Sequence, residues 1–202
     1  SPHNRPIAFP YTKLQVANAA VNQGAGFIVT SLAEARRRGL PESRLIFIGY
    51  GAAAHEDERF LFRSRFDRSP SLEVAIEQAL SLNGLGTDDL DLVELYSCFP
   101  CVPKMARRAF GWPLDRPISV FGGLTFGGGP IGNYMSHAVA AMAAALRGSA
   151  RKGLLFANGG YATNNHAIIL SGEPLAARFP QDFDVQDEAN ARRGPIPPLD
   201  EG

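Results

Sequence analysis

Short apolar runs alternate with stretches of helical character along this chain, and this alternation limits its fold more than any other feature. Runs rich in β-branched and aromatic residues predict strands, and apolar residues every three or four positions predict helices. The expected strands are 26–30, 45–51, 90–96, 118–120, 153–157 and 166–170, and the expected helices are 11–22, 32–38, 69–82, 100–110 and 134–146. This order predicts a layered α/β fold whose sheet is covered.

Composition narrows the classes of function. Twenty basic residues balance twenty acidic ones, whereas a protein that binds the phosphate backbone normally has a basic excess, so we expect no nucleic-acid partner. No apolar run approaches the roughly 20 residues that span a bilayer, so we expect no membrane insertion. The chain has only two cysteines, too few for a disulfide framework, and we therefore expect a reducing, cytoplasmic location.

The sequences at both ends are typical of a fragment of a longer protein. It starts at Ser1 without an initiator Met or a secretion signal, and it ends in a Pro-rich polar stretch, 195–202. We interpret it as a fragment, with a complete protein of processed N-terminus as the alternative. Residues 173–202 are expected to leave the domain as an extended tail or linker.

The glycine-dense stretch 122–132 (GGLTFGGGPIG) is the richest candidate for a site. Glycines let a ligand approach the main chain closely, and the helix that follows can offer free N–H groups to an oxyanion. No Lys-Ser or Lys-Thr follows it, so it is not a P-loop. Pro130 interrupts it and no G-x-G-x-x-G opens the helix, which argues against a dinucleotide site.

The order of three blocks resembles the C-terminal half of the thiolase superfamily. These blocks are Tyr96-Ser97-Cys98-Phe99, Gly128-Gly129-Pro130-Ile131-Gly132 and Ala157-Asn158-Gly159-Gly160. They stand where the family has an Asn-Glu-Ala-Phe or His-Asp-Cys-Phe block, a Gly-His-Pro-x-Gly block and a Cys-x-Gly-Gly block. Residues 9–25 and 158–166 look more narrowly like the thiolase-like proteins of actinobacterial lipid and steroid metabolism.

The resemblance covers about residues 11–172 and implies a division of the chain. It makes 1–40 the end of the N-terminal thiolase half (a helix plus a strand), 41–172 the C-terminal thiolase-like domain, and 173–202 a linker to a missing C-terminal domain. It also implies a mixed sheet with helices on both faces. The expected partners are an acyl-CoA and either the N-terminal half of the same protein or a homodimer mate.

The blocks depart from the family at the residues that carry its chemistry. Gly129 replaces the catalytic His and Ala157 replaces the catalytic Cys, and neither can be a nucleophile or take a proton. The resemblance therefore implies a thiolase-like protein that binds coenzyme A thioesters as substrate or ligand, without covalent cofactor and without cysteine-based acyl transfer. The frame expected to cradle the thioester is Gly127, Gly128, Gly129, Asn158, Gly159 and Gly160.

Two further functions stay open. Tyr96 and Tyr161 flank two of the blocks and are candidate acid and base for retro-aldol cleavage of a β-hydroxyacyl-CoA, with His137 or His166 as an alternative base. The loss of both family catalytic side chains equally favours a non-catalytic acyl-CoA-binding or assembly subunit.

Two weaker signals point to other chemistry. Cys98-Phe99-Pro100-Cys101 is a C-x-x-C at a strand-to-helix junction, typical of redox pairs. Other strands and helices precede this junction, however, whereas thioredoxin-like domains place the motif on their first strand–helix unit. His55, Glu56 and Asp57 follow one another in a polar loop without the spacing of a metal site, so we expect no metal.

Overall fold

A mixed five-stranded sheet forms the centre of the molecule in the computed structural model, which describes residues 3–96, 98–149, 151–176, 181–196 and 198. The strand order is β4-β5-β6-β3-β7. β4 pairs with β5 in parallel, β6 is antiparallel to both β5 and β3, and β7 is parallel to β3. Its strands are β3 (Phe47–His55), β4 (Leu92–Leu95), β5 (Lys152–Gly159), β6 (Asn164–Ser171) and β7 (Asp182–Asp184).

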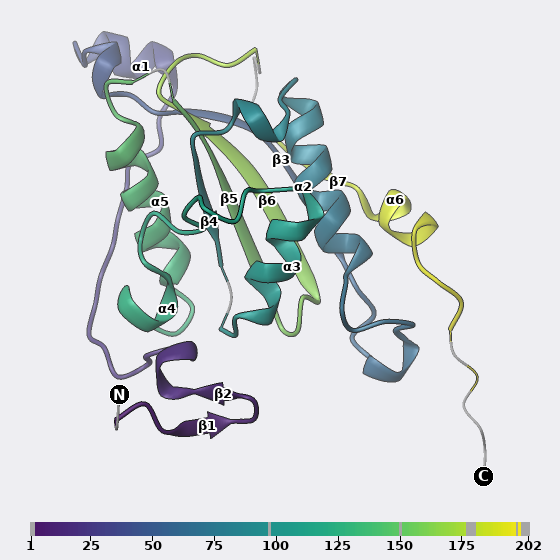
Figure 1. The fold of residues 1–202 in the computed structure, drawn as a ribbon. Helices are drawn as coiled ribbons and strands as arrows, with labels where there is room; N and C mark the ends of the chain where they lie inside the picture. Colours follow the sequence, from purple (N-terminus) through teal and green to yellow (C-terminus); the bar gives the residue numbers. More distant parts are fainter. Residues whose placement is uncertain (1–2, 97, 150, 177–180, 197, 199–202) are drawn as a thin grey trace.

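Helices cover both faces of this sheet (Figure 1), which confirms the predicted architecture. The α-helices are α1 (Leu32–Arg37), α2 (Pro70–Leu82), α3 (Cys101–Ala109), α4 (Gly123–Phe126), α5 (Tyr134–Leu146) and α6 (Gln186–Ala191). One core cluster joins α2 and α3 to Leu154, Phe156 and Ile169 of the sheet. A second joins α5 to Leu155 and Leu170. Successive strand side chains point to opposite faces, so adjacent residues of β5 supply the two cores.

The ends of the helices follow the local sequence. Ser69 is the N-cap of α2 and its hydroxyl accepts from the amide of Leu72, with Pro70 at the first helical position. The long alanine-rich helix is found at Tyr134–Leu146, as predicted. β5 and β6 pair as antiparallel neighbours around the Gly159-Gly160 turn, again as predicted.

The prediction for residues 11–30 is wrong. Instead of a helix over 11–22, the chain forms a small hairpin, β1 (Pro6–Ala8) with β2 (Tyr11–Thr12), then a 3₁₀ turn (Lys13–Gln15) and irregular backbone. The backbone of this segment bonds to the glycine-rich region instead of forming helical hydrogen bonds. The amide of Asn18 donates to the carbonyl of Leu124, and the hydroxyl of Thr125 donates to the carbonyl of Val16. The expected strand 26–30 pairs with no strand among the described residues, and Ile28 is 94% exposed.

The strand expected at 118–120 is also absent, because a side chain distant in sequence binds its backbone. The amides of Val120 and Phe121 both donate to the carboxylate of Glu94, at 2.9 and 3.0 Å, rather than to a neighbouring strand. A side chain has therefore taken the place of a sheet partner, and this backbone becomes the entry to the glycine-rich loop.

Residues 182–191 differ from the extended tail that the sequence predicts. β7 adds to the sheet edge beside β3, and α6 packs on α2 with Ala189 fully buried. The pairing joins residues about 130 positions apart, which no local pattern signals. The parts of the predicted tail at 177–180, 197 and 199–202 lie outside the described residues.

Candidate functional site

The predicted site lies at the edge of the sheet formed by the C-terminal ends of the parallel strands β4 and β5. The two strands are parallel, so Tyr96 and Ala157 follow the same edge, and the amide of Tyr96 donates to the carbonyl of Phe156 at 3.1 Å. Ala157 shares its sheet face with Leu155, which packs in the α5 core, and Tyr96 packs against the same core. The first and third sequence blocks are therefore neighbours on the α5 face.

A buried acid fixes the glycine-rich loop beside them. Glu94 is fully buried on β4, and its carboxylate accepts from Ser119, Val120, Phe121 and the hydroxyl of Tyr134. The hydroxyl of Ser119 in turn accepts from the amides of Gly122 and Gly123, at 2.7 and 2.9 Å. No Lys, Arg or His among the described residues forms an ion pair with Glu94. The loop itself thus supplies the donors that solvate this acid.

The oxyanion cradle predicted at Gly127–Gly129 is largely closed. The amide of Gly127 donates to the carbonyl of Gly123 at 2.7 Å, and the amide of Gly129 donates to the carbonyl of Asn18 at 2.8 Å. Those two N–H groups are used by the fold. Of these three amides, that of Gly128 has no acceptor in the described part of the chain and is left for a ligand oxygen, and the side chain of Gln23 lies against this glycine. The N-terminal segment therefore lies over the loop.

An aromatic series connects Tyr96 with His137. The rings of Tyr96 and Tyr134 lie 5.0 Å apart, those of Tyr134 and Phe121 5.3 Å, and those of Phe121 and His137 5.4 Å in a stacked geometry. The Nε2 atom of His137 is buried and has no hydrogen-bond partner among the described residues. Two of the three predicted catalytic side chains therefore belong to one cluster on the α5 face.

Tyr161, the third, faces the other core. It packs against the cluster of α2 and α3, and its hydroxyl donates to the carbonyl of Phe66 at 2.8 Å. Nearby, the amide group of Asn158 donates to the carbonyl of Gly160, which has a φ of +62°, while Oδ1 of Asn158 is buried without a partner in the described part of the chain. The structure does not bring Tyr161 together with Tyr96.

Both tyrosines are held in the protonated form. Burial, and next the hydrogen bond with the thiol of Cys98 (Oη to Sγ 3.7 Å), raise the pKa of Tyr96 to about 12. Burial, and next Cys101, raise the pKa of Tyr161. Tyrosine is a weak base unless its pKa falls. The raised pKa values leave both phenols protonated, able to donate hydrogen bonds, and disfavour the role of base.

The two cysteines are free, and each lies beside tyrosine. Cys98 is exposed next to Tyr96, and Cys101 is half-buried at the start of α3. Cys101 contacts Tyr161 and Tyr11; its hydrogen bond with Tyr11 is the main cause that raises the pKa of Tyr11 to about 12.

The other candidates from the sequence have partners of their own. Nε2 of His166 lies 2.8 Å from Asp182 of β7. Glu56 accepts from Ser69 and Ser71, and Asp57 pairs with Arg59. In the described ranges no group of three His, Cys, Asp or Glu side chains could hold a metal ion. None of the helices described is long and apolar enough to cross a membrane.

Sequence reasoning missed the residues that organise the site. Glu94, Ser119 and Tyr134 hold the loop, and Tyr11 reaches the edge from the N-terminal hairpin. One signal was available: Glu94 is an acid inside the otherwise apolar run of β4, and a buried acid needs several donors. No local pattern identified those donors.

Among the comparisons with known proteins, the one with solved structures supports the fold described above. No protein-family model and no curated protein matches the chain. Among solved structures, it is similar to a monomeric SCP2-thiolase like protein type 1 from Mycobacterium smegmatis, with 30% identity and a TM-score of 0.80. The match covers 96% of this chain and 43% of that protein, so the chain spans less than half of its length. The fold is therefore thiolase-like.

Proposed function

We propose that this chain binds an acyl-CoA thioester at the edge formed by β4 and β5, and that it does not carry out cysteine-based acyl transfer. The observation that carries the proposal is the thiolase-like fold with Ala157 and Gly129 at the positions where the resemblance implies Cys and His. A role in lipid or steroid metabolism, as the resemblance implies, belongs to the same proposal.

Unsatisfied polar atoms at this edge support a ligand with amide groups. The Gly128 amide, Oδ1 of Asn158 and Nε2 of His137 have no hydrogen-bond partner within the described residues. A buried polar atom without a partner costs about 1–3 kcal/mol. The pantetheine arm of coenzyme A carries both N–H and C=O groups, and the thioester carbonyl is a further acceptor, so such a ligand offers partners for the Gly128 amide and for His137 on the α5 side. Asn158 follows Ala157 on β5 and faces the other side of the sheet.

An exposed apolar segment supports a protein partner. Phe27, Ile28 and Val29 lie in extended, irregular backbone, and Val29 is 66% exposed. Three adjacent apolar residues in water are a typical feature of an uncovered interface. We assign this segment to contact with the N-terminal half of the same protein or with a homodimer mate.

The experiment restores a thiol at the proposed position. In Ala157→Cys, the new thiolate can attack a bound acyl-CoA, forming an acyl–cysteine thioester and releasing free CoA. Ala144→Cys, on the exposed side of α5, is the matched control. We expect octanoyl-CoA to acylate residue 157 at least ~10-fold faster than residue 144, since a bound acyl group has a high effective concentration. Peptide mass spectrometry separates these sites from Cys98 and Cys101; equal rates at 157 and 144 contradict the proposal.

A retro-aldolase is the second candidate, favoured by the unpartnered Nε2 of His137. In this reaction His137 takes the β-hydroxyl proton, the Cα–Cβ bond breaks to release a carbonyl compound, and the acyl-CoA enolate takes a proton from Tyr96. We expect Tyr96→Phe and His137→Gln each to lower turnover of a β-hydroxyacyl-CoA at least ~100-fold, while Tyr161→Phe has little effect. Binding without turnover leaves the protein an acyl-CoA-binding subunit.

A further inference from the structure

A cavity of about 350 Å³ lies beyond the C-terminal end of β3. Its walls are the loop 56–70 between β3 and α2, the turn at Tyr161-Ala162, and residues 192–196 after α6. We propose that this cavity binds a small organic anion, a phosphate or carboxylate group attached to an apolar body. The inference is independent of acyl-CoA binding.

Arginine dominates the charge of the cavity. Five guanidinium groups line it, against two carboxylates, those of Glu56 and Asp57. The guanidinium groups belong to Arg63, Arg65, Arg68, Arg192 and Arg193. Three of them pair with acids that lie outside its walls: Asp67, Glu73 and Glu77. Arg193 pairs with Glu56, so Arg63 is the one guanidinium group of the walls without an ion pair among the described residues.

Arg63 is the centre of the proposed site. The residue is only 8% exposed. Its guanidinium group donates to the carbonyls of Asp57 and Tyr161 and to the hydroxyl of Thr163, at 2.9, 2.6 and 2.7 Å. All three acceptors are neutral, and no carboxylate among the described residues lies within ion-pair distance of it. Burial lowers the pKa of Arg63, yet arginine stays charged.

This arrangement leaves donors for an oxyanion. A guanidinium carries five N–H bonds, and the three bonds of Arg63 use one each at Nε, Nη1 and Nη2. Two N–H bonds remain, the number that a phosphate or carboxylate accepts from one arginine in a bidentate pair. Glu56 and Asp57 act on Arg63 only from beyond ion-pair distance, so an anion brought directly beside this buried cation stabilises it further.

The remaining walls select an organic ligand over a bare ion. Phe62, Pro70, Met105 and Ile196 give the cavity an apolar side. Its volume lies at the small end of the range of ligand sites, roughly 300–1,000 Å³. A single ring or short alkyl chain bearing one anionic group fits both the size and the two kinds of wall.

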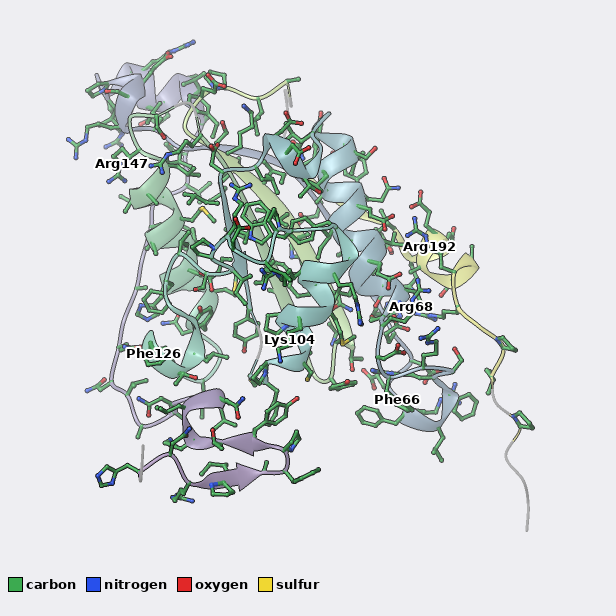
Figure 2. The ribbon with its side chains drawn as sticks, in the orientation of Figure 1. Phe66, Arg68, Lys104, Phe126, Arg147 and Arg192 are labelled. Atoms are coloured by element: carbon green, nitrogen blue, oxygen red, sulfur yellow. The ribbon has the colours of Figure 1, made fainter. Side chains whose placement is uncertain are left out.

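The cavity and the proposed thioester site lie on opposite sides of the sheet. Figure 2 shows Arg68 and Arg192 beside α2 and α6, and Phe126 of the glycine-rich region on the other side. The cavity does touch the turn after β5, where Ala162 has a φ of +46°, a conformation that favours glycine. Arg63 holds the residues on both sides of Ala162.

Phenyl phosphate, benzoate and inorganic phosphate are suitable probes, titrated by calorimetry at constant ionic strength set with KCl. We expect phenyl phosphate or benzoate to bind saturably, inorganic phosphate to bind more weakly for want of an apolar body, and neutral benzyl alcohol not to bind. Whichever of phenyl phosphate and benzoate binds with the higher affinity shows whether the natural ligand is a phosphate ester or a carboxylate.

Variants locate the binding. Arg63→Lys, which cannot form the bidentate pair, and Arg65→Gln, at an exposed side chain whose loss leaves the fold intact, are each expected to weaken binding at least ~5-fold. Arg36→Gln is the control and keeps full affinity, because Arg36 is an exposed residue of α1 that pairs with Glu42. Absence of saturable binding, equal affinity in all variants, or equal binding of benzyl alcohol overturns the proposal. None of these probes contains a thioester, so failure here leaves acyl-CoA binding untouched, and the reverse holds as well.

Discussion

Substitution of Glu94 tests how far the glycine-rich loop depends on one buried carboxylate. In Glu94→Ala, the amides of Val120 and Phe121 and the hydroxyl of Tyr134 lose their acceptor. Each unsatisfied buried group costs about 1–3 kcal/mol, and part-buried amides regain some water. We therefore expect a loss of about 3–5 kcal/mol in the free energy of unfolding.

Glu94→Gln separates the charge from the shape. Its amide oxygen still accepts from the two loop amides and from the hydroxyl of Ser119, whose own oxygen already accepts from Gly122 and Gly123. Its NH₂ group can donate to the oxygen of Tyr134, so every partner keeps a bond. Only the strengthening by charge is lost, and we expect a cost of about 1–2 kcal/mol. Exposed Glu58 provides the control, because Glu58→Ala should change stability by no more than about 0.5 kcal/mol.

Urea unfolding, followed by the fluorescence of buried Trp112 and by far-ultraviolet circular dichroism, gives these free energies. Hydrogen exchange of residues 119–123 reports the loop directly and should rise in Glu94→Ala more than in Glu94→Gln. The reasoning is refuted if the two variants lose equal stability, or if Glu94→Ala loses less than about 1 kcal/mol.

Three other predictions follow from single features. Tyr11 and Tyr96, with pKa values of about 12, keep their protons in the folded protein while the unfolded chain loses them near pH 10. The free energy of unfolding should therefore fall as the pH rises from about 10 to 12. Phenolate absorbance during a pH titration checks this, and Tyr96→Phe should remove one late-titrating group. Gly128→Ala should cost about 1 kcal/mol more than Gly132→Ala. Both glycines have positive φ, but only Gly128 would place its Cβ against the end of the Gln23 side chain, at 2.6 Å, and moving that side chain breaks its hydrogen bond to the carbonyl of Gly127; equal losses in urea unfolding contradict this. Iodoacetamide should modify exposed Cys98 before half-buried Cys101, as peptide mass spectrometry can show, and the opposite order argues against the described start of α3.

Much of the site was open to prediction because its blocks are local. Tyr96 and Ala157 each end an apolar strand, and parallel pairing brings those ends together. The pairing of Tyr96 with Tyr161 as acid and base, in contrast, could not be judged from the sequence. The path of a turn decides on which face of the sheet its residues lie. The turn at Tyr161 is held by Arg63, 98 positions away, which donates to the carbonyl of Tyr161.

The sequence by itself determined the alternation of elements, the cap of α2, the extent of α5 and the β5–β6 pair, because apolar periodicity and capping residues act over a few positions. Only the tertiary structure decided the path of residues 11–30, the loss of a strand at 118–120, the docking of β7 and α6, and the arginine-lined cavity. In each case a backbone or charged group is satisfied by a partner distant in sequence, such as Leu124 for Asn18 or Glu94 for Val120. Hydrogen bonds of that kind leave no periodic trace, so they become visible only once the chain is folded.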